Sequence, residues 1–187
     1  MNTILIDCDG VILDWENGFH SYMESLGHTK NNNDGWLESQ YDLDQSVVRK
    51  HIREFNQSNC IEDLVSIEDA VYYMQELKKL NYKFVCITSL SLDNSIQERR
   101  LKNFEKLFGQ DFFEDIIFLD TYSPKDDILK KYANTGYWWI EDNISNAVVG
   151  KSLGLRSILF NKSAEGLLSV SNWKELYWTI VEDEQLY

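Results

Sequence analysis

The chain has 187 residues, of which 43% are hydrophobic and 13% aromatic, enough for a folded domain with a buried core. Acidic residues outnumber basic ones by 31 to 18, and the resulting net charge of −13 disfavours a protein that binds an extended nucleic acid. The sequence shows no leader or membrane-spanning segment, and its three cysteines are scattered, so we expect a cytoplasmic protein without a membrane partner.

Apolar runs of strand length alternate with helical patterns along the chain. In chain order, the expected elements are a strand at 3–8, helices at 15–26, 45–55 and 70–80, a strand at 82–88, a helix at 93–109, a strand at 116–119, a helix from 124, strands at 137–140 and 157–160, and a helix from 172. This alternation predicts an α/β fold with a mainly parallel sheet.

Several helix starts carry N-terminal signals. Residues 66–69 resemble a capping box, and Asp93 is expected to cap the following helix. Pro124 suits a first helical turn, and Asn172 with Glu175 three positions later suits the start of the last helix.

Residues 14–66 interrupt the alternation with two helical patterns and no convincing strand. Because this insertion follows the first strand directly, we expect it above the C-terminal edge of the sheet, where open α/β folds bind ligands. We therefore predict a core domain of residues 1–13 and 67–187 and a helical cap of residues 14–66.

The first strand runs into Asp7, Cys8, Asp9 and Gly10. If the strand continues to Asp9, the two carboxylates point the same way and Cys8 points away. Carboxylates this close ionise together only when a cation lies between them. A solvated acidic turn is the alternative at this point, and the rest of the chain must decide.

Polar residues end other strands too. Thr88 and Ser89 follow the second strand, Glu141 and Asp142 follow the fourth, and Lys125 begins the helix before it. In a parallel sheet these positions share one edge, so the side chains are expected to converge on a single crevice.

The residue types at this crevice suit phosphoryl transfer. Asp7 is the expected nucleophile, and Asp9 the acid that protonates the leaving oxygen and the base that then activates water. Thr88 is expected to donate a hydrogen bond to the phosphoryl group, and Lys125 to hold both that group and Asp7. Asp142, together with Asp7 and the Asp9 carbonyl, is expected to bind Mg²⁺.

These residues resemble the four motifs of haloacid dehalogenase-like (HAD) phosphatases: residues 7–11, Thr88, Lys125, and Glu141-Asp142 followed by Asn146. The resemblance implies a Rossmann-like three-layer core with strand order 3-2-1-4-5, a type 1 cap and an aspartyl-phosphate intermediate on Asp7. Asp9 marks phosphoryl transfer rather than dehalogenation. Glu141 is expected to contact the metal site through water, and Asn146 is either part of that site or a polar residue of a helix face.

Residues 7–19 and 88–89 are further similar to 5′(3′)-deoxyribonucleotidases. This similarity favours a nucleoside monophosphate as substrate, with Trp15 and Phe19 stacking on the base, although cap packing is the alternative. Gly10 and Ser89 are the other expected substrate-binding residues.

The predicted function is that of a Mg²⁺-dependent phosphomonoesterase with a small phosphorylated metabolite as its partner. A phosphomutase and a catalytically silent binding module are the alternatives. A phosphomutase must hold a second phosphate, for which the cap offers Arg49, Lys50 and Arg53, although these three residues also suit a solvated helix face.

Overall fold

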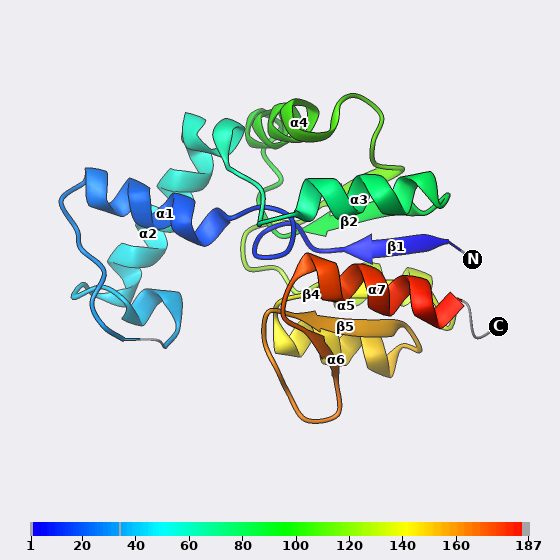
Figure 1. Ribbon diagram of the computed structural model, residues 1–187. Helices are drawn as coiled ribbons and strands as arrows, with labels where there is room; N and C mark the ends of the chain where they lie inside the picture. Colours follow the sequence, from blue (N-terminus) through cyan, green and yellow to red (C-terminus); the bar gives the residue numbers. More distant parts are fainter. Residues whose placement is uncertain (1, 34, 185–187) are drawn as a thin grey trace.

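The fold is seen in a computed structural model that describes residues 2–33 and 35–184. Its centre is a six-stranded sheet of order β3-β2-β1-β4-β5-β6 in which every pairing is parallel (Figure 1). The predicted α/β class and the order 3-2-1-4-5 are confirmed, and the three-residue β6 was not predicted. The strands are β1 Thr3–Ile6, β2 Lys83–Thr88, β3 Asp115–Phe118, β4 Trp138–Glu141, β5 Arg156–Phe160 and β6 Leu168–Val170.

Helices cover both faces of the sheet. Ile4 and Ile6 of β1 pack with α3, α4 and α7, whereas Leu5 packs with α5 and α6, as the two-residue period of a strand requires. No helix in the described ranges is both long and apolar enough to cross a membrane. The core helices are α3 Ala70–Lys79, α4 Asn94–Phe108, α5 Asp126–Leu129, α6 Ile144–Ser152 and α7 Trp173–Glu184, with a 3₁₀ turn, η3, at Lys130–Tyr132.

β1 ends two residues earlier than predicted. The carbonyl of Cys8 accepts a hydrogen bond from the backbone N–H of Ile12 at 2.8 Å, which closes a tight loop, and Gly10 takes a left-handed conformation with φ of +83°. Strand alternation is therefore the wrong explanation for Asp7 and Asp9 facing one site. Both line the same cavity because the loop bends.

The insertion after β1 forms a helical cap at one end of the sheet, toward which the strand arrows point (Figure 1). Its two sides meet the core together, because Leu13 pairs with Ser66 and the backbone N–H of Asp14 donates to the Val65 carbonyl at 2.9 Å. The predicted domain boundaries lie at this connection. The cap elements are α1 Trp15–Ser25, η1 Leu37–Ser39, α2 Gln45–Gln57 and η2 Asn59–Asp63.

Two predicted helix caps are confirmed. The Asp93 carboxylate accepts from the Ser95 N–H at 2.8 Å, and the Asn172 side chain accepts from the Glu175 N–H at 2.9 Å. The capping box expected at residues 66–69 is wrong. The helix begins at Ala70 with Asp69 as its N-cap residue, so Ser66 stands three residues too early to cap it, and Asp69, with a left-handed φ of 62°, makes no side-chain cap.

Candidate active site

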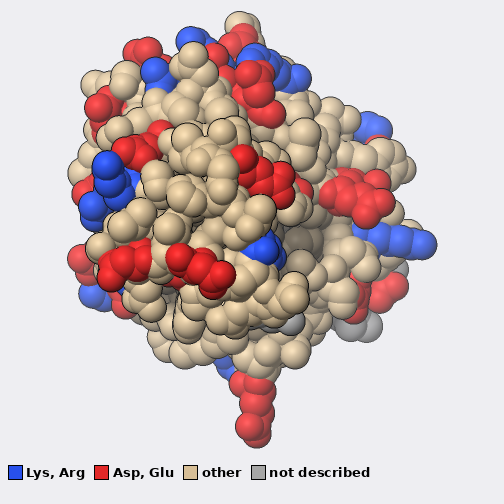
Figure 2. All heavy atoms as spheres, turned by 90° about the vertical axis from the view of Figure 1, so that its left-hand side faces the viewer, with Lys and Arg blue, Asp and Glu red and all other residues tan. Residues whose placement is uncertain are grey.

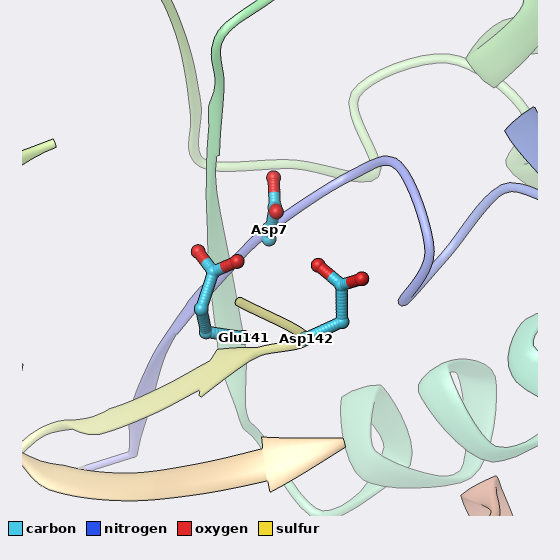
Figure 3. A group of neighbouring side chains, drawn as sticks. All are labelled: Asp7, Glu141 and Asp142. Carbon is cyan, nitrogen blue, oxygen red and sulfur yellow. The ribbon is translucent and has the colours of Figure 1, made fainter. Parts of the chain in front are cut away.

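Three carboxylates meet at the C-terminal edge of the sheet. Asp7 follows β1, while Glu141 ends β4 and Asp142 follows it, and β1 and β4 are neighbours. One oxygen from each side chain lies within 4.8 Å of the others. Figure 3 shows the three groups turned toward one another. The structure therefore brings together three of the four predicted metal-site residues.

Lys125 lies against this acidic cluster. Its buried Nζ is 2.6 Å from Asp7 Oδ1 and 2.8 Å from Glu141 Oε2. Burial alone would lower the pKa of Lys125, but the two carboxylates outweigh burial and raise it above its ordinary value. The lysine therefore stays charged, in contact with the predicted nucleophile.

A single ammonium does not balance the cluster. Burial and the nearby Glu141 raise the pKa of Asp7 well above its ordinary value and raise that of Asp142 to about 6. Burial also acts to raise the pKa of Glu141, but Lys125 and hydrogen bonds outweigh it and hold that pKa below its ordinary value. A divalent cation would relieve this excess of negative charge, and carboxylate oxygens are the ligands that Mg²⁺ prefers. The donor set therefore fits Mg²⁺, with Asp7 and Asp142 as the candidate ligands.

Lys162 is a second cation at the cluster that sequence reasoning missed. Its half-exposed Nζ lies 3.0 Å from Asp142 Oδ2. It comes from the loop after β5, where no motif or periodic pattern marks it.

Gly10 is explained by packing rather than by substrate contact. A Cβ at this position would come within 2.7 Å of Asp142 Oδ2, and the φ of +83° already favours glycine. Gly10 does not line the cavity, so its predicted substrate role is not supported. Its absent side chain lets the nucleophile loop approach Asp142.

Asp9 lines the cavity but stands apart from the acidic cluster. Its Oδ1 accepts a hydrogen bond from Arg100 Nη1 at 2.6 Å. The expectation that Asp9 binds metal concerns its carbonyl oxygen and stays a prediction. Sequence reasoning missed Arg100, although a signal was present: Ile96, Arg100 and Phe104 share one face of α4, so a charge stands in a buried stripe.

The two hydroxyl residues after β2 differ in exposure. Thr88 is fully buried, and its hydroxyl has no hydrogen-bond partner in the described part of the chain. Ser89 lines the cavity and donates to the Ser123 carbonyl at 2.9 Å. The predicted contact of Thr88 with a phosphoryl group stays a prediction, for which its unpaired donor is available.

The carboxylates open into a cavity of about 510 Å³ between core and cap. Trp15 and the 82% exposed Trp36 line it from the cap, and Tyr122 lines it from the core. The cap-bearing face of the molecule is hollowed, with acidic side chains gathered at several places on it (Figure 2). Because Trp36 and Tyr122 are both accessible, a ligand can reach flat apolar surfaces on both sides of the junction.

Phe19 does not have the predicted substrate role in this arrangement. Its ring is fully buried in the cap and stacks on Trp15, with centroids 5.2 Å apart and an interplanar angle of 9°. The packing alternative therefore holds for Phe19. Trp15 borders the cavity, and its Nε1 donates to Asn56 Oδ1 at 2.9 Å.

The basic residues of α2 lie outside this cavity. Arg49 Nε is 3.2 Å from Glu38 Oε1, Lys50 Nζ is 3.5 Å from Glu54 Oε1, and Arg53 lines a separate depression of about 150 Å³. They do not form a second phosphate subsite at the acidic cluster. Asn146 does line the cavity, and its Nδ2 is 3.4 Å from Glu141 Oε2.

The sheet order, the cap after β1 and the acidic edge define a haloacid dehalogenase-like fold. The chain is similar in structure to a predicted phosphatase from Clostridium acetobutylicum, with a TM-score of 0.67, 15% identity and coverage of 97% of this chain and 98% of that one. A HAD-superfamily hydrolase from Ehrlichia chaffeensis is also similar in structure, with a TM-score of 0.58, 15% identity and coverage of 97% of this chain and 96% of that one. For CbbY from Rhodobacter sphaeroides, solved in complex with phosphate, the TM-score is 0.61 and the identity 14%, with coverage of 94% of this chain and 96% of that one. Similarities at this identity establish the fold.

The sequence itself matches no family model. It is 26% identical over 137 residues to an uncharacterized 32.4 kDa protein from the Gp30-rIII intergenic region of Enterobacteria phage T4. The match covers 69% of this chain and 49% of the phage protein, so the matched region spans about half the length of that relative.

Proposed function

We propose that the chain is a Mg²⁺-dependent phosphatase of small phosphomonoesters that forms an aspartyl-phosphate on Asp7. The observation that carries the proposal is the position of the Asp7 carboxylate at the cavity, 2.6 Å from Lys125 Nζ and grouped with Glu141 and Asp142. The descriptions of structural neighbours as phosphatases and hydrolases support it.

The first half of the reaction transfers the phosphoryl group to Asp7. A carboxylate oxygen of Asp7 bonds to phosphorus while the bond from phosphorus to the ester oxygen breaks, and that oxygen takes a proton from the Asp9 carboxyl. Lys125 orients Asp7 and offsets charge on the phosphoryl oxygens. Bound Mg²⁺, held by Asp7 and Asp142, would supply further positive charge to those oxygens.

The second half restores Asp7. The Asp9 carboxylate takes a proton from water as the water oxygen bonds to phosphorus and the bond between Asp7 and phosphorus breaks, which releases inorganic phosphate. One residue serves as acid and then as base, so the protons balance over the cycle. Positioned acid–base catalysis of this kind contributes about 10²- to 10⁴-fold to a rate.

Charge at the cavity favours a phosphatase over a phosphomutase. Among the described residues that line it, Lys125 is the one cation. Arg49 and Lys162 contact the lining residues Glu38 and Asp142, but each is already paired with that carboxylate, so neither is free to hold a second phosphate. The presence of nucleophile, acid–base residue, lysine and acidic cluster together disfavours a catalytically silent binding module.

Nucleoside monophosphates are the substrates that the cavity walls favour. Trp15, Trp36 and Tyr122 offer aromatic surface for a base, and Asn56 adds a polar group beside them. The cavity volume of about 510 Å³ suits a ligand of this size.

The proposal is tested by a phosphate-release screen over nucleoside monophosphates and sugar phosphates, with Mg²⁺ and with chelator. We expect Mg²⁺-dependent release that Asp7→Asn abolishes. The matched control is Asp115→Asn, which neutralises an exposed carboxylate at the start of β3, at the opposite end of the sheet. This variant should retain activity. Absence of release from every substrate, or full activity of Asp7→Asn, would contradict the phosphatase. Cleavage of sugar phosphates alone would contradict the nucleotide substrate.

A further inference from the structure

Arg100 is a buried cation that the proposed reaction does not yet use. Its side chain has no solvent exposure, and its Nη1 lies 2.6 Å from Asp9 Oδ1. The same nitrogen donates to the sulfur of Cys8. Among the described residues, Asp9 is the one carboxyl group that Arg100 contacts.

This arrangement is an expensive way to stabilise a fold. Arg100 Nε and Nη2 are buried and have no hydrogen-bond partner among the described residues. Removing a guanidinium from water costs free energy, and a single contact with a carboxylate does not offset that cost while other N–H groups of the guanidinium stay unpaired. A well-packed apolar side chain in this place could be equally stable. The contact with Asp9 is thus better explained by what it does for the carboxylate.

Arg100 separates the two aspartates of the loop. Lys125 contacts Asp7, whereas Arg100 holds Asp9 outside the acidic cluster. No described residue other than Arg100 hydrogen-bonds to the Asp9 carboxylate. The hydrogen bond at Oδ1 restrains the side chain, and Oδ2, which has no hydrogen-bond partner among the described residues, is left for proton exchange at the cavity that Asp9 lines. Fixing an acid–base group within reach of the reacting atoms is a large part of its effect on rate.

We infer that Arg100 is the positioning residue for Asp9, holding its carboxyl group where it meets the leaving oxygen of the substrate. The inference rests on the proposed phosphatase function. Arg100 itself contacts neither substrate nor phosphoryl group; it acts through Asp9. Loss of Arg100 should therefore slow the reaction most for substrates whose leaving oxygen needs a proton in order to depart.

The test compares kcat/KM for two esters of similar size, phenyl phosphate and 4-nitrophenyl phosphate. This ratio reports the steps up to phosphoryl transfer, in which the nitrophenolate leaves with little need of a proton. In Arg100→Met we expect kcat/KM to fall about 100-fold for phenyl phosphate and less than about 5-fold for 4-nitrophenyl phosphate. Arg100→Lys, which keeps a cation, should restore part of the loss.

Arg99→Met is the matched control, because it removes the same charge from the neighbouring position of α4, where Arg99 contacts the Gln57 carbonyl and not Asp9. Arg99→Met should leave unchanged the factor by which kcat/KM differs between the two esters. If Arg100→Met does not fold, Arg100→Lys and Arg100→Gln carry the comparison.

The outcomes separate the two proposals. Equal losses for both esters in the Arg100 variants, with an active wild type, would overturn the positioning role and leave the phosphatase intact. A wild type that releases phosphate from neither ester nor any substrate of the screen would overturn both.

Discussion

Asp142 should make the metal-free protein less stable as the pH rises. The folded protein raises the pKa of this carboxyl from 3.8 to about 6, through burial and the charge of Glu141. That difference corresponds to about 3 kcal/mol. Because the folded pKa is the higher one, the stability is present below about pH 4 and is lost as the pH rises through 6. About half of the loss, roughly 1.5 kcal/mol, falls between pH 5 and pH 7.5.

Urea unfolding of wild type and Asp142→Asn, in chelator at pH 5 and pH 7.5, measures this effect. Other titrating groups contribute to both proteins, so the difference between their pH dependences reports Asp142 together with its effect on the neighbouring Asp7. We expect wild type to lose about 1.5 kcal/mol more than the variant over this interval. Saturating Mg²⁺, at about 100 times its Kd, should return about 2.7 kcal/mol to wild type at pH 7.5 and much less to the variant. Parallel pH dependences and equal responses to Mg²⁺ would show that Asp142 neither destabilises the metal-free protein at pH 7.5 nor binds Mg²⁺.

Four further substitutions test the site and the cap. Lys125→Met leaves buried carboxylates without their cation, so urea unfolding at pH 7.5 should show the free energy of unfolding lowered by about 3–5 kcal/mol. The loss should be smaller at pH 5. A loss below about 1 kcal/mol at pH 7.5 would contradict the ion pairing. Lys162→Met removes a cation that competes for Asp142, so calorimetry should show Mg²⁺ binding about 2- to 5-fold tighter, and weaker binding would speak against that competition. Trp36→Ala should raise KM by about 2- to 10-fold without loss of stability. Phe19→Ala should instead lower the free energy of unfolding by about 3–5 kcal/mol and leave KM unchanged. The reverse pattern would mean that the two cap residues are wrongly assigned.

Strand ends were the part of the site that the sequence could predict. Asp7 and Asp142 lie beside the ends of apolar runs, and a parallel sheet brings such ends to one edge whatever the loop details. Lys125 was predicted from its place at the start of the helix before β4. The strand order did not follow from this alternation; it came from the resemblance to HAD phosphatases. β6 escaped prediction because three residues, of which Val170 alone is fully buried, carry too little periodic signal.

Side-chain contacts across elements could not be predicted in the same way. Arg100 is 91 positions from its partner Asp9, and only the packing of α4 against the β1 loop brings them together. In the cap, Phe19 and Trp36 are both aromatic, and their sequence neighbourhoods do not show which one is buried. Their exposures of 0% and 82% are set by how α1 and η1 pack.

Asp7 is the residue on which we expect the phosphoryl group to be carried. The direct measurement uses Asp9→Asn, which lacks the base for the second half-reaction, with 4-nitrophenyl phosphate, whose leaving group needs little protonation. After acid quenching and borohydride reduction, an aspartyl-phosphate becomes homoserine, which peptide mass spectrometry can locate. We predict homoserine at position 7 and none when Asp7→Asn is added to the variant. Nitrophenol release with no modification at position 7, or with the modification at another carboxylate, would exclude Asp7 as the nucleophile.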